Sequence, residues 1–298
     1  MIEKPITFYS EGHQLKGTVY LPEDYREGEK RPVIISNSGY QGFNEFYPKL
    51  FSRYFTAAGY IGIGFDYRGF AESEGPQGRV MLDEQVQDIR NCITFALVQP
   101  EVDPARVGLL GWGMGALNVV EAAAVDERVK AVAALNGFYN GARWLKSIHT
   151  SKDWKSLLEA AEEDRAMRVT TGKSKRVDPF THYVLDPATA DYVSKELAPL
   201  APFGKQIDLQ FTESILDANA ERVVDAIAPR SLFIGHGKNN LLHPKREAEA
   251  LYAAAKDPKE LYWINGKHND FMYYDHPVMN DLIDHLLDFF QTIKESEK

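Results

Sequence analysis

The stretch LLGWGMGAL spans Leu109–Leu117, and its first residues end the apolar run RVGLLG. Six such runs occur along the chain, each with the length and composition of a strand buried on both faces of a sheet. The other five are RPVIISNS, YIGIGFDY, VKAVAALN, RSLFIGHG and ELYWING. Segments with helical spacing of apolar residues lie between them. This alternation predicts an α/β protein with a mostly parallel central sheet and helices on both faces.

Three further segments have patterns that predict a particular secondary structure. PITFYS and LKGTVYLP flank the turn-rich EGHQ, a pattern that predicts an N-terminal antiparallel hairpin. From Glu84 to Leu97 apolar residues recur at three- and four-residue steps, as in a helix with one buried face. We expect a last helix to begin near Pro277, because proline suits the first helical turn and apolar residues at helical spacing follow it.

The stretch of residues 137–228 is too long to be a simple connection between two strands. It contains Trp144, Trp154, the helix-like pieces DWKSLLEAAEEDRAM and ESILDANAERVVDAI, and the basic interruption TTGKSKR. We predict that residues 1–136 and 229–298 form an α/β core and that residues 137–228 form a helical cap over the carboxyl edge of its sheet. The alternative is a set of additional helices packed on the side.

Composition narrows the class of partner. The 298 residues carry a net charge of -9, which argues against nucleic acid or an anionic membrane surface as the main partner. Cys92 is the single cysteine, so no intrachain disulfide forms, and we expect a cytoplasmic protein with no signal segment and no membrane span. The histidines show no metal-ligand spacing, so we expect neither a metal nor a cofactor. A small-molecule substrate fits best, and homo-oligomerisation stays open.

Five short motifs stand in order along the chain. They are SGYQG (38–42), FDYRGFAESEG (65–75), DPARVGLLGWGMG (103–115), HGKNNLLHP (236–244) and GKHNDFMYYDHP (266–277). In this order they resemble the α/β-hydrolase superfamily, in particular its dienelactone-hydrolase-like and acyl-peptidase-like esterase branches. The resemblance covers nearly the whole chain. It implies that the third motif is the nucleophile elbow, a sharp turn from strand to helix.

The resemblance assigns the catalytic positions in the order nucleophile, acid, histidine, which here read Gly113, Asn240 and His268. Gly111 and Gly115 supply the small residues that flank an elbow. Gly113 tolerates the strained backbone of the turn but has no side chain, so it cannot form an acyl-enzyme. The alternative is that Gly113 merely relieves strain and enlarges the pocket.

Asn240 is assigned to the acid position by its distance from Pro244, and Asn239 is the alternative. An amide there can hydrogen-bond to His268 but cannot stabilise an imidazolium, and it favours the wrong tautomer. A plain turn asparagine is the competing interpretation. His268 lies in a loop after a predicted strand, where we expect it to face the pocket, with Asp270 as a candidate orienting group.

The resemblance also implies an oxyanion hole made by the backbone N–H groups of Tyr40 and Met114. These backbone donors do not depend on a serine at position 113. Ser38 and Ser73 are the nearest spare hydroxyls by motif position, but neither lies on an elbow, and we do not expect either to replace the nucleophile.

The sequence therefore predicts an enzyme without a serine nucleophile that acts on a small organic carbonyl compound. His268 would be its general acid or base, and suitable reactions are C–C bond hydrolysis, decarboxylation, elimination and cyclisation. Two alternatives stay open. One is a non-catalytic binding protein, and the other is an engineered variant of an ordinary esterase that has lost its nucleophile.

Overall fold

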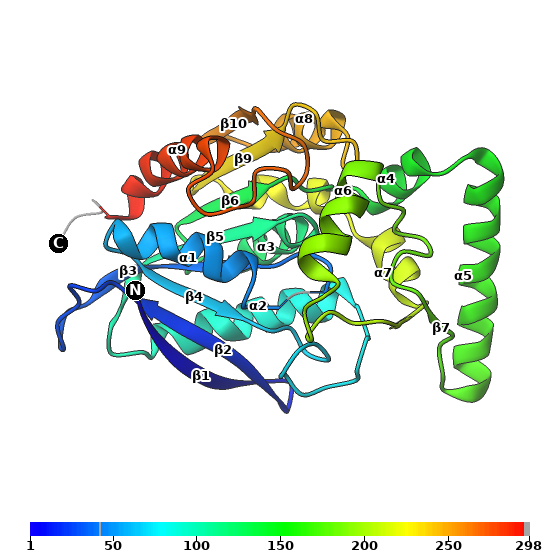
Figure 1. The fold of residues 1–298 in the computed structure, drawn as a ribbon, viewed down its shortest axis with the longest axis horizontal. Helices are drawn as coiled ribbons and strands as arrows, with labels where there is room; N and C mark the ends of the chain where they lie inside the picture. The colour runs from blue at the N-terminus through cyan, green and yellow to red at the C-terminus, as the bar shows by residue number, and fades with distance from the viewer. Residues whose placement is uncertain (42, 295–298) are drawn as a thin grey trace.

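The central sheet determines where every other element lies (Figure 1). The computed structural model describes residues 1–41 and 43–294, and within them eight strands form one sheet in the order β1-β2-β4-β3-β5-β6-β9-β10. The strands are β1 (Ile2–Ser10), β2 (His13–Leu21), β3 (Arg31–Asn37), β4 (Ile61–Phe65), β5 (Val102–Trp112), β6 (Ala131–Leu135), β9 (Ser231–Gly237) and β10 (Lys259–Ile264).

The pairing of these strands confirms the predicted fold class. β1 and β2 form the expected antiparallel hairpin, with Ile2 opposite Leu21, and β2 joins β4 in antiparallel register. All further neighbours, from β4 through β3, β5, β6 and β9 to β10, pair in parallel. Each of the six apolar runs forms one of these strands.

Helices cover both faces of the sheet (Figure 1). One face packs against α1 (Tyr47–Ala57) and α9 (Pro277–Lys294). The other packs against α2 (Leu82–Leu97), α3 (Met114–Val125) and α8 (Lys245–Ala254). The predicted helices after Glu84 and from Pro277 are thereby confirmed, with α2 beginning two residues earlier than expected.

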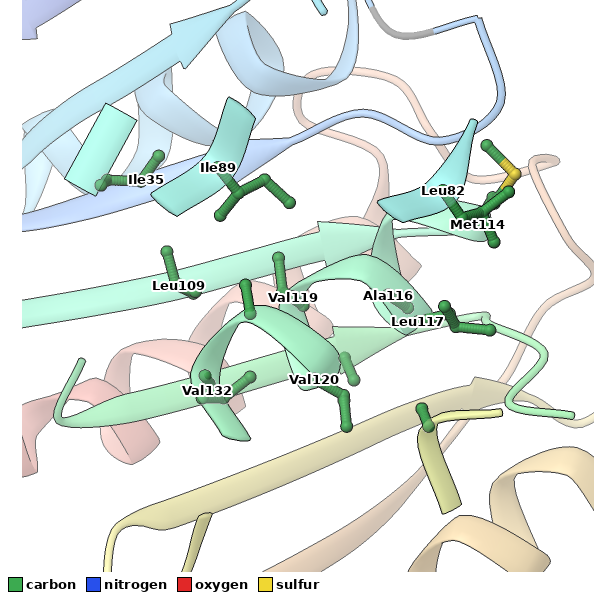
Figure 2. Close-up of a cluster of buried hydrophobic side chains, with 14 of the residues drawn as sticks. Ile35, Leu82, Ile89, Leu109, Met114, Ala116, Leu117, Val119, Val120 and Val132 are labelled. Carbon is green, nitrogen blue, oxygen red and sulfur yellow. The ribbon is translucent and has the colours of Figure 1, made fainter. Parts of the chain in front are cut away.

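Alternation along the strands divides the core into two layers. Ile35 and Leu109 point to the face of α2 and α3, whereas their neighbours Ile34 and Leu110 point to the face of α1 and α9. Figure 2 shows the first layer, in which α3 places a row of apolar side chains against β5 and β6. That row contains Met114, Ala116, Leu117, Val119 and Val120.

The turn between β5 and α3 depends on close backbone contacts. A Cβ atom at Gly111 would lie 2.1 Å from the carbonyl oxygen of Gly115, and one at Gly115 would lie 2.2 Å from that of Ser38. Side chains at these two positions would collide with backbone that cannot move aside. The two glycines therefore allow α3 to start directly above the sheet and beside the loop that follows β3.

The inserted segment, residues 137–228, leaves the sheet after β6 and returns at β9. It contains α4 (Gly141–Ile148), α5 (Ser151–Thr171), α6 (Pro187–Tyr192) with a following π-turn, and α7 (Phe211–Asp217), together with the short strands β7 (Arg176–Val177) and β8 (Ile207–Asp208). In Figure 1, α5 stands farthest from the sheet.

One of the two helix-like pieces in this segment was predicted incorrectly. DWKSLLEAAEEDRAM lies within α5, as expected. ESILDANAERVVDAI is not continuous, because α7 ends at Asp217 and only short 3-10 turns follow. Ala218 takes an extended conformation and Asn219 forms a bridge with Asn140, and this tertiary pairing outweighs the local helical preference.

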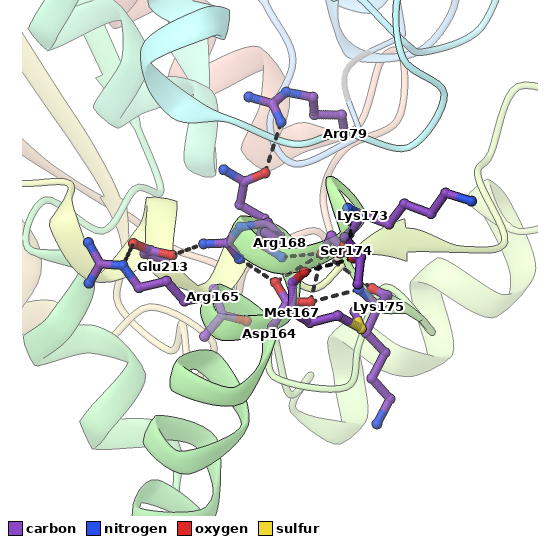
Figure 3. A network of polar contacts seen from close by, with 12 residues as sticks. Arg79, Asp164, Arg165, Met167, Arg168, Lys173, Ser174, Lys175 and Glu213 are labelled. Carbon is purple, nitrogen blue, oxygen red and sulfur yellow. Dashed lines mark hydrogen bonds and ion pairs between the residues drawn. The ribbon is translucent and has the colours of Figure 1, made fainter.

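A network of polar contacts holds the C-terminal end of α5 in place (Figure 3). The buried Asp164 accepts hydrogen bonds from Arg168, from the Ser174 hydroxyl at 3.0 Å and from the Lys175 backbone at 2.7 Å. Arg168 also pairs with Glu213 of α7. The TTGKSKR stretch thus closes the helix while most of its side chains, the lysines included, stay exposed.

In the part of the chain that the structure describes, no helix combines the length and the apolar character needed to cross a bilayer.

A buried ion pair links α2 to the β1–β2 hairpin and to the loop that follows β4. Asp88 of α2 is fully buried and accepts hydrogen bonds from the Arg68 guanidinium, at 2.6 and 2.9 Å, and from the Ser10 hydroxyl at 2.6 Å. The Arg68 side chain also donates to the Ser10 hydroxyl at 3.0 Å. Loss of one partner would leave the other charged group buried and unpaired.

We therefore expect Asp88→Ala to lower the free energy of unfolding by about 3–5 kcal/mol, because Arg68 stays buried without its carboxylate. Urea denaturation followed by circular dichroism measures this loss. Asp191→Ala is the control, since Asp191 pairs with Lys195 on the exposed surface and its loss should cost less than about 1 kcal/mol. Similar shifts in the two variants would contradict the assignment.

Candidate functional site

A cavity of about 90 Å³ lies where the carboxyl ends of β3, β5 and β10 meet the inserted segment. Four loops of the core contribute to it, at residues 38–41, 112–114, 242 and 268–269. The inserted segment contributes the opposite wall. The members of that wall are Phe180, Tyr183, Leu185, Thr189, Val193, Leu197 and Phe203.

Gly113 lies at the floor of this cavity, between the last residue of β5 and the first of α3. Its backbone has φ 61° and ψ -124°, a strained conformation that glycine adopts at little cost. A Cβ atom built at Gly113 would lie 3.6 Å from Nε2 of His268, an ordinary contact distance. Position 113 therefore faces the histidine and has room for a small side chain.

His268 is buried, and a single amide determines which of its ring nitrogens carries the hydrogen. Nδ2 of Asn240 lies 3.1 Å from Nδ1 of His268. Oδ1 of Asn240 accepts a hydrogen bond of 3.0 Å from the backbone N–H of His243, so the amide cannot turn over without losing this bond. The NH2 group therefore donates to Nδ1, and the hydrogen of His268 resides on Nε2, which faces Gly113.

Burial also keeps this histidine uncharged. Desolvation lowers the pKa of His268 to about 3, with His236 adding a smaller repulsion. The folded protein then binds this proton only in strong acid, whereas an unfolded histidine binds it from about pH 6.5 downward. Stability is therefore lost as the pH falls from that value toward 3. At neutral pH the site holds a neutral imidazole that donates from Nε2.

Neighbouring groups hold the loop of His268 in place. The side chain of Asn136, at the end of β6, donates to the His268 carbonyl at 2.9 Å and accepts from the Gly237 N–H at 2.7 Å. The His243 ring donates from Nδ1 to the Asn136 carbonyl at 2.5 Å and accepts at Nε2 from the Tyr183 hydroxyl at 3.0 Å. Burial lowers the pKa of His243 well below its usual range.

These supporting residues were not found from the sequence. The sequence offered one indication for Asn136, because this polar residue directly ends the apolar run VKAVAALN. In the structure its φ of 52° is positive, a conformation that residues other than glycine rarely adopt. His243 lies inside the HGKNNLLHP motif, but its motif position says nothing of its contact with a ring from the inserted segment. Tyr183 has no signal in the local sequence.

Several residues that the sequence offered as alternatives make no contact with His268 or are hydrogen-bonded to other groups. Asn239 is exposed, and Asn240 is the amide that meets His268. Asp270 accepts from the backbone of Lys267 and has no bond to His268. The hydroxyl of Ser38, which lies in the cavity wall, donates to the Phe43 carbonyl at 3.0 Å. The Ser73 hydroxyl is similarly engaged with the Asp66 carbonyl, at 2.6 Å.

The two backbone donors suggested for an oxyanion hole both belong to residues that line the cavity, Tyr40 and Met114. Met114 is the first residue of α3, so its N–H has no partner within the helix. A Cβ atom at Gly39 would lie 3.2 Å from the Met114 nitrogen, so the first loop passes directly against the elbow. Gly42, the last residue of SGYQG, lies outside the described residues.

The Tyr40 side chain ties this loop to the inserted segment. Its ring stacks on that of Tyr183, with centroids 4.6 Å apart, and its hydroxyl donates to the Pro179 carbonyl. Across residues 1–41 and 43–294, no cluster of three His, Cys, Asp or Glu side chains is suited to hold a metal ion.

Comparison with known proteins agrees with this fold. The model of the family described as X-Pro dipeptidyl-peptidase (S15 family) matches residues 11–270. A 31.7 kDa Escherichia coli protein from the traX-finO intergenic region is 30% identical, over 88% of this chain and 91% of its own. Thiohydrolase apmlB of Arthrinium phaeospermum is 25% identical, over 92% and 93%. The solved structure of the α/β hydrolase GrgF from Penicillium superimposes with a TM-score of 0.81 at 20% identity, covering 99% of this chain and 100% of that one.

The tautomer of His268 is open to a direct test. We expect the imidazole nitrogens of His268 in a ¹⁵N NMR spectrum to show hydrogen on Nε2 and none on Nδ1, unchanged from pH 5 to pH 8. Asn240→Asp should move the hydrogen to Nδ1 and raise the pKa of His268, because a carboxylate accepts from Nδ1–H and stabilises the imidazolium. A wild-type spectrum with hydrogen on Nδ1 would contradict the assigned amide orientation.

Proposed function

The chain belongs to the X-Pro dipeptidyl-peptidase (S15) family and has the α/β-hydrolase fold, and we propose that it acts on a small organic carbonyl compound without an acyl-enzyme intermediate. The observation that carries the proposal is the pair formed by Gly113 and His268, which face each other across an elbow with no nucleophile. Acyl transfer through position 113 needs a side chain that glycine does not have.

His268 acts in this proposal as a neutral hydrogen-bond donor to the oxygen on which negative charge develops. Its Nε2–H is directed toward the place where a nucleophile would otherwise stand, and the low pKa of the ring keeps it neutral. A carbonyl oxygen bound there would receive the hydrogen bond as negative charge develops on it. A general-base role at Nε2 would require the opposite tautomer, which Asn240 disfavours.

The N–H groups of Tyr40 and Met114 would complete the oxyanion site. Preorganised backbone donors are worth more in a dry cavity than in water, and they need no reorganisation during the reaction. Serine proteases that lack their triad still accelerate hydrolysis about 10³–10⁴-fold through such donors and substrate binding. Loss of the serine therefore leaves a site that can still stabilise an oxyanion.

The reactions compatible with this site are C–C bond hydrolysis, decarboxylation, elimination and cyclisation, since each builds negative charge on a carbonyl oxygen. Those that begin with activation of the carbonyl fit a donor histidine better than those that begin with proton abstraction. A relative named thiohydrolase supports a carbonyl ligand in this cavity. We further propose that residues 137–228 act as its cap and that the protein works in the cytoplasm.

A non-catalytic binding protein is the second candidate. The amide of Asn240 favours it, because this side chain cannot stabilise an imidazolium in the way that a carboxylate does. The two candidates differ in whether His268 contributes to turnover or only to affinity.

The missing groups can be supplied by substitution. We expect Gly113→Ser alone to give little esterase activity, because Nε2–H of His268 would donate to the new hydroxyl and could not deprotonate it. Adding Asn240→Asp should raise the hydrolysis of 4-nitrophenyl butyrate at least ~10³-fold, since the equivalent amide costs about 10⁴ in a serine protease triad. Equal rates for the single and double variants would show that the tautomer is not limiting.

The proposed function itself is tested with the wild-type protein. Aryl 1,3-diketones and β-keto esters are incubated with it, and product formation is followed by liquid chromatography. We expect His268→Ala to lower turnover about 10²–10³-fold, the usual cost of one oxyanion donor. His13→Ala, far from the cavity, is the control. If turnover is unchanged in His268→Ala, the hypothesis that His268 takes part in catalysis is refuted. Binding of these compounds without turnover would favour a non-catalytic binding protein.

A further inference from the structure

The walls of the cavity carry no full charge. Among the described residues that line it, none is Asp, Glu, Lys or Arg. Aromatic side chains dominate instead, from α1 and its preceding loop on one side and from the inserted segment on the other. They include Phe46, Tyr47, Trp112, Phe180, Tyr183 and Phe203.

The titratable groups in these walls also stay neutral near pH 7. Burial raises the pKa values of Tyr40, Tyr47 and Tyr183 above their usual range, so the phenols keep their protons. His268 is held in its neutral form by the same effect, with a pKa of about 3. An ionic ligand would therefore meet no counter-charge on any side of the cavity.

The polar groups that remain are neutral dipoles. Gln41 accepts from the Gly204 N–H at 2.7 Å with Oε1, while its buried Nε2 has no partner among the described residues. Asn269 donates to the Tyr47 hydroxyl, and its buried Oδ1 is likewise without a partner in residues 1–41 and 43–294. Together with Nε2–H of His268, they offer hydrogen bonds to carbonyl, hydroxyl or amide groups.

We propose that this cavity selects uncharged carbonyl compounds with a planar, apolar body and rejects carboxylates and ammonium ions. The proposal rests on the proposed function and narrows its substrate class. The N–H donors of Tyr40, Met114 and His268 would serve the reacting carbonyl oxygen. A permanent charge elsewhere on the ligand would leave water for walls without a counter-charge and lose several kcal/mol of solvation. An uncharged carbonyl compound incurs no such penalty and can use the same donors.

One consequence concerns the release of X-Pro dipeptides, the reaction after which the family is named. An enzyme that releases dipeptides from the amino end of a peptide must bind an N-terminal ammonium group, and an acidic side chain is its natural partner. The described walls contain none. This chain therefore does not use its cavity for X-Pro dipeptide release, and decarboxylation of an ionised acid leaves the set of candidate reactions.

Isothermal titration calorimetry with four small aryl ketones tests the proposal on the wild-type protein at pH 7. Methyl 4-acetylbenzoate and 4-acetylbenzamide are neutral, 4-acetylbenzoate is an anion and 4-(aminomethyl)acetophenone is a cation. We expect both neutral probes to bind at least ~100-fold more tightly than either ion. Similar affinities for all four, tighter binding of an ion, or no binding of the neutral probes would overturn the proposal.

A charge placed in the wall should reverse the preference. Leu197→Arg introduces a cation beside the cavity and is expected to tighten 4-acetylbenzoate at least ~10-fold relative to its methyl ester. Leu158→Arg is the matched control, since Leu158 is exposed on α5 away from the cavity. An unchanged ratio in a folded Leu197→Arg protein would count against the proposal, and the wild-type comparison decides the matter if that variant does not fold.

The two proposals fail in different ways. If the protein prefers neutral probes but its turnover is unaffected by His268→Ala, the proposed function is refuted and the proposed ligand class still stands. Turnover that depends on His268 in a protein that binds ions equally well would do the reverse.

Discussion

The structure depends on the close crossing of three backbone segments at the end of β5. Gly111, Gly115 and Gly39 let the strand, the first turn of α3 and the loop after β3 approach to distances that no side chain would allow. This crossing brings Met114 and position 113 to the wall of the same cavity. Because it is made of backbone, the elbow keeps its shape when the residue at its tip is glycine.

The second constraint is one hydrogen bond, from the backbone of His243 to Oδ1 of Asn240. It orients an amide, the amide sets the tautomer of His268, and in this tautomer Nε2 donates a hydrogen bond and cannot accept a proton. A carboxylate at position 240 would accept from the ring and impose the opposite tautomer. In the function that we propose, Gly113 and Asn240 act together, since a donor histidine would have little use beside a nucleophile that needs a base.

The fold was accessible from the sequence because its signals are local. Apolar runs of strand length, the hairpin turn EGHQ and the proline at position 277 each act within a few residues, and all three predictions are confirmed. The break after α7 was not accessible, because Asn219 leaves the helix to pair with Asn140, a residue far away in the chain. The positions of Gly113, Asn240 and His268 were predicted from the resemblance to the α/β-hydrolase superfamily, and in the structure His268 lies beside both Gly113 and Asn240.

The sequence by itself therefore determined the sheet, the elbow and the absence of a nucleophile side chain at position 113, since these follow from residue type and local spacing. Only the tertiary structure decided what His268 can do. Its tautomer arises from the contact with Asn240, and its lowered pKa arises from burial. Contacts between residues far apart in the chain, such as Asn136 with the His268 carbonyl, hold its loop in place. Burial and hydrogen-bond direction are properties of the packed molecule, and no local pattern encodes them.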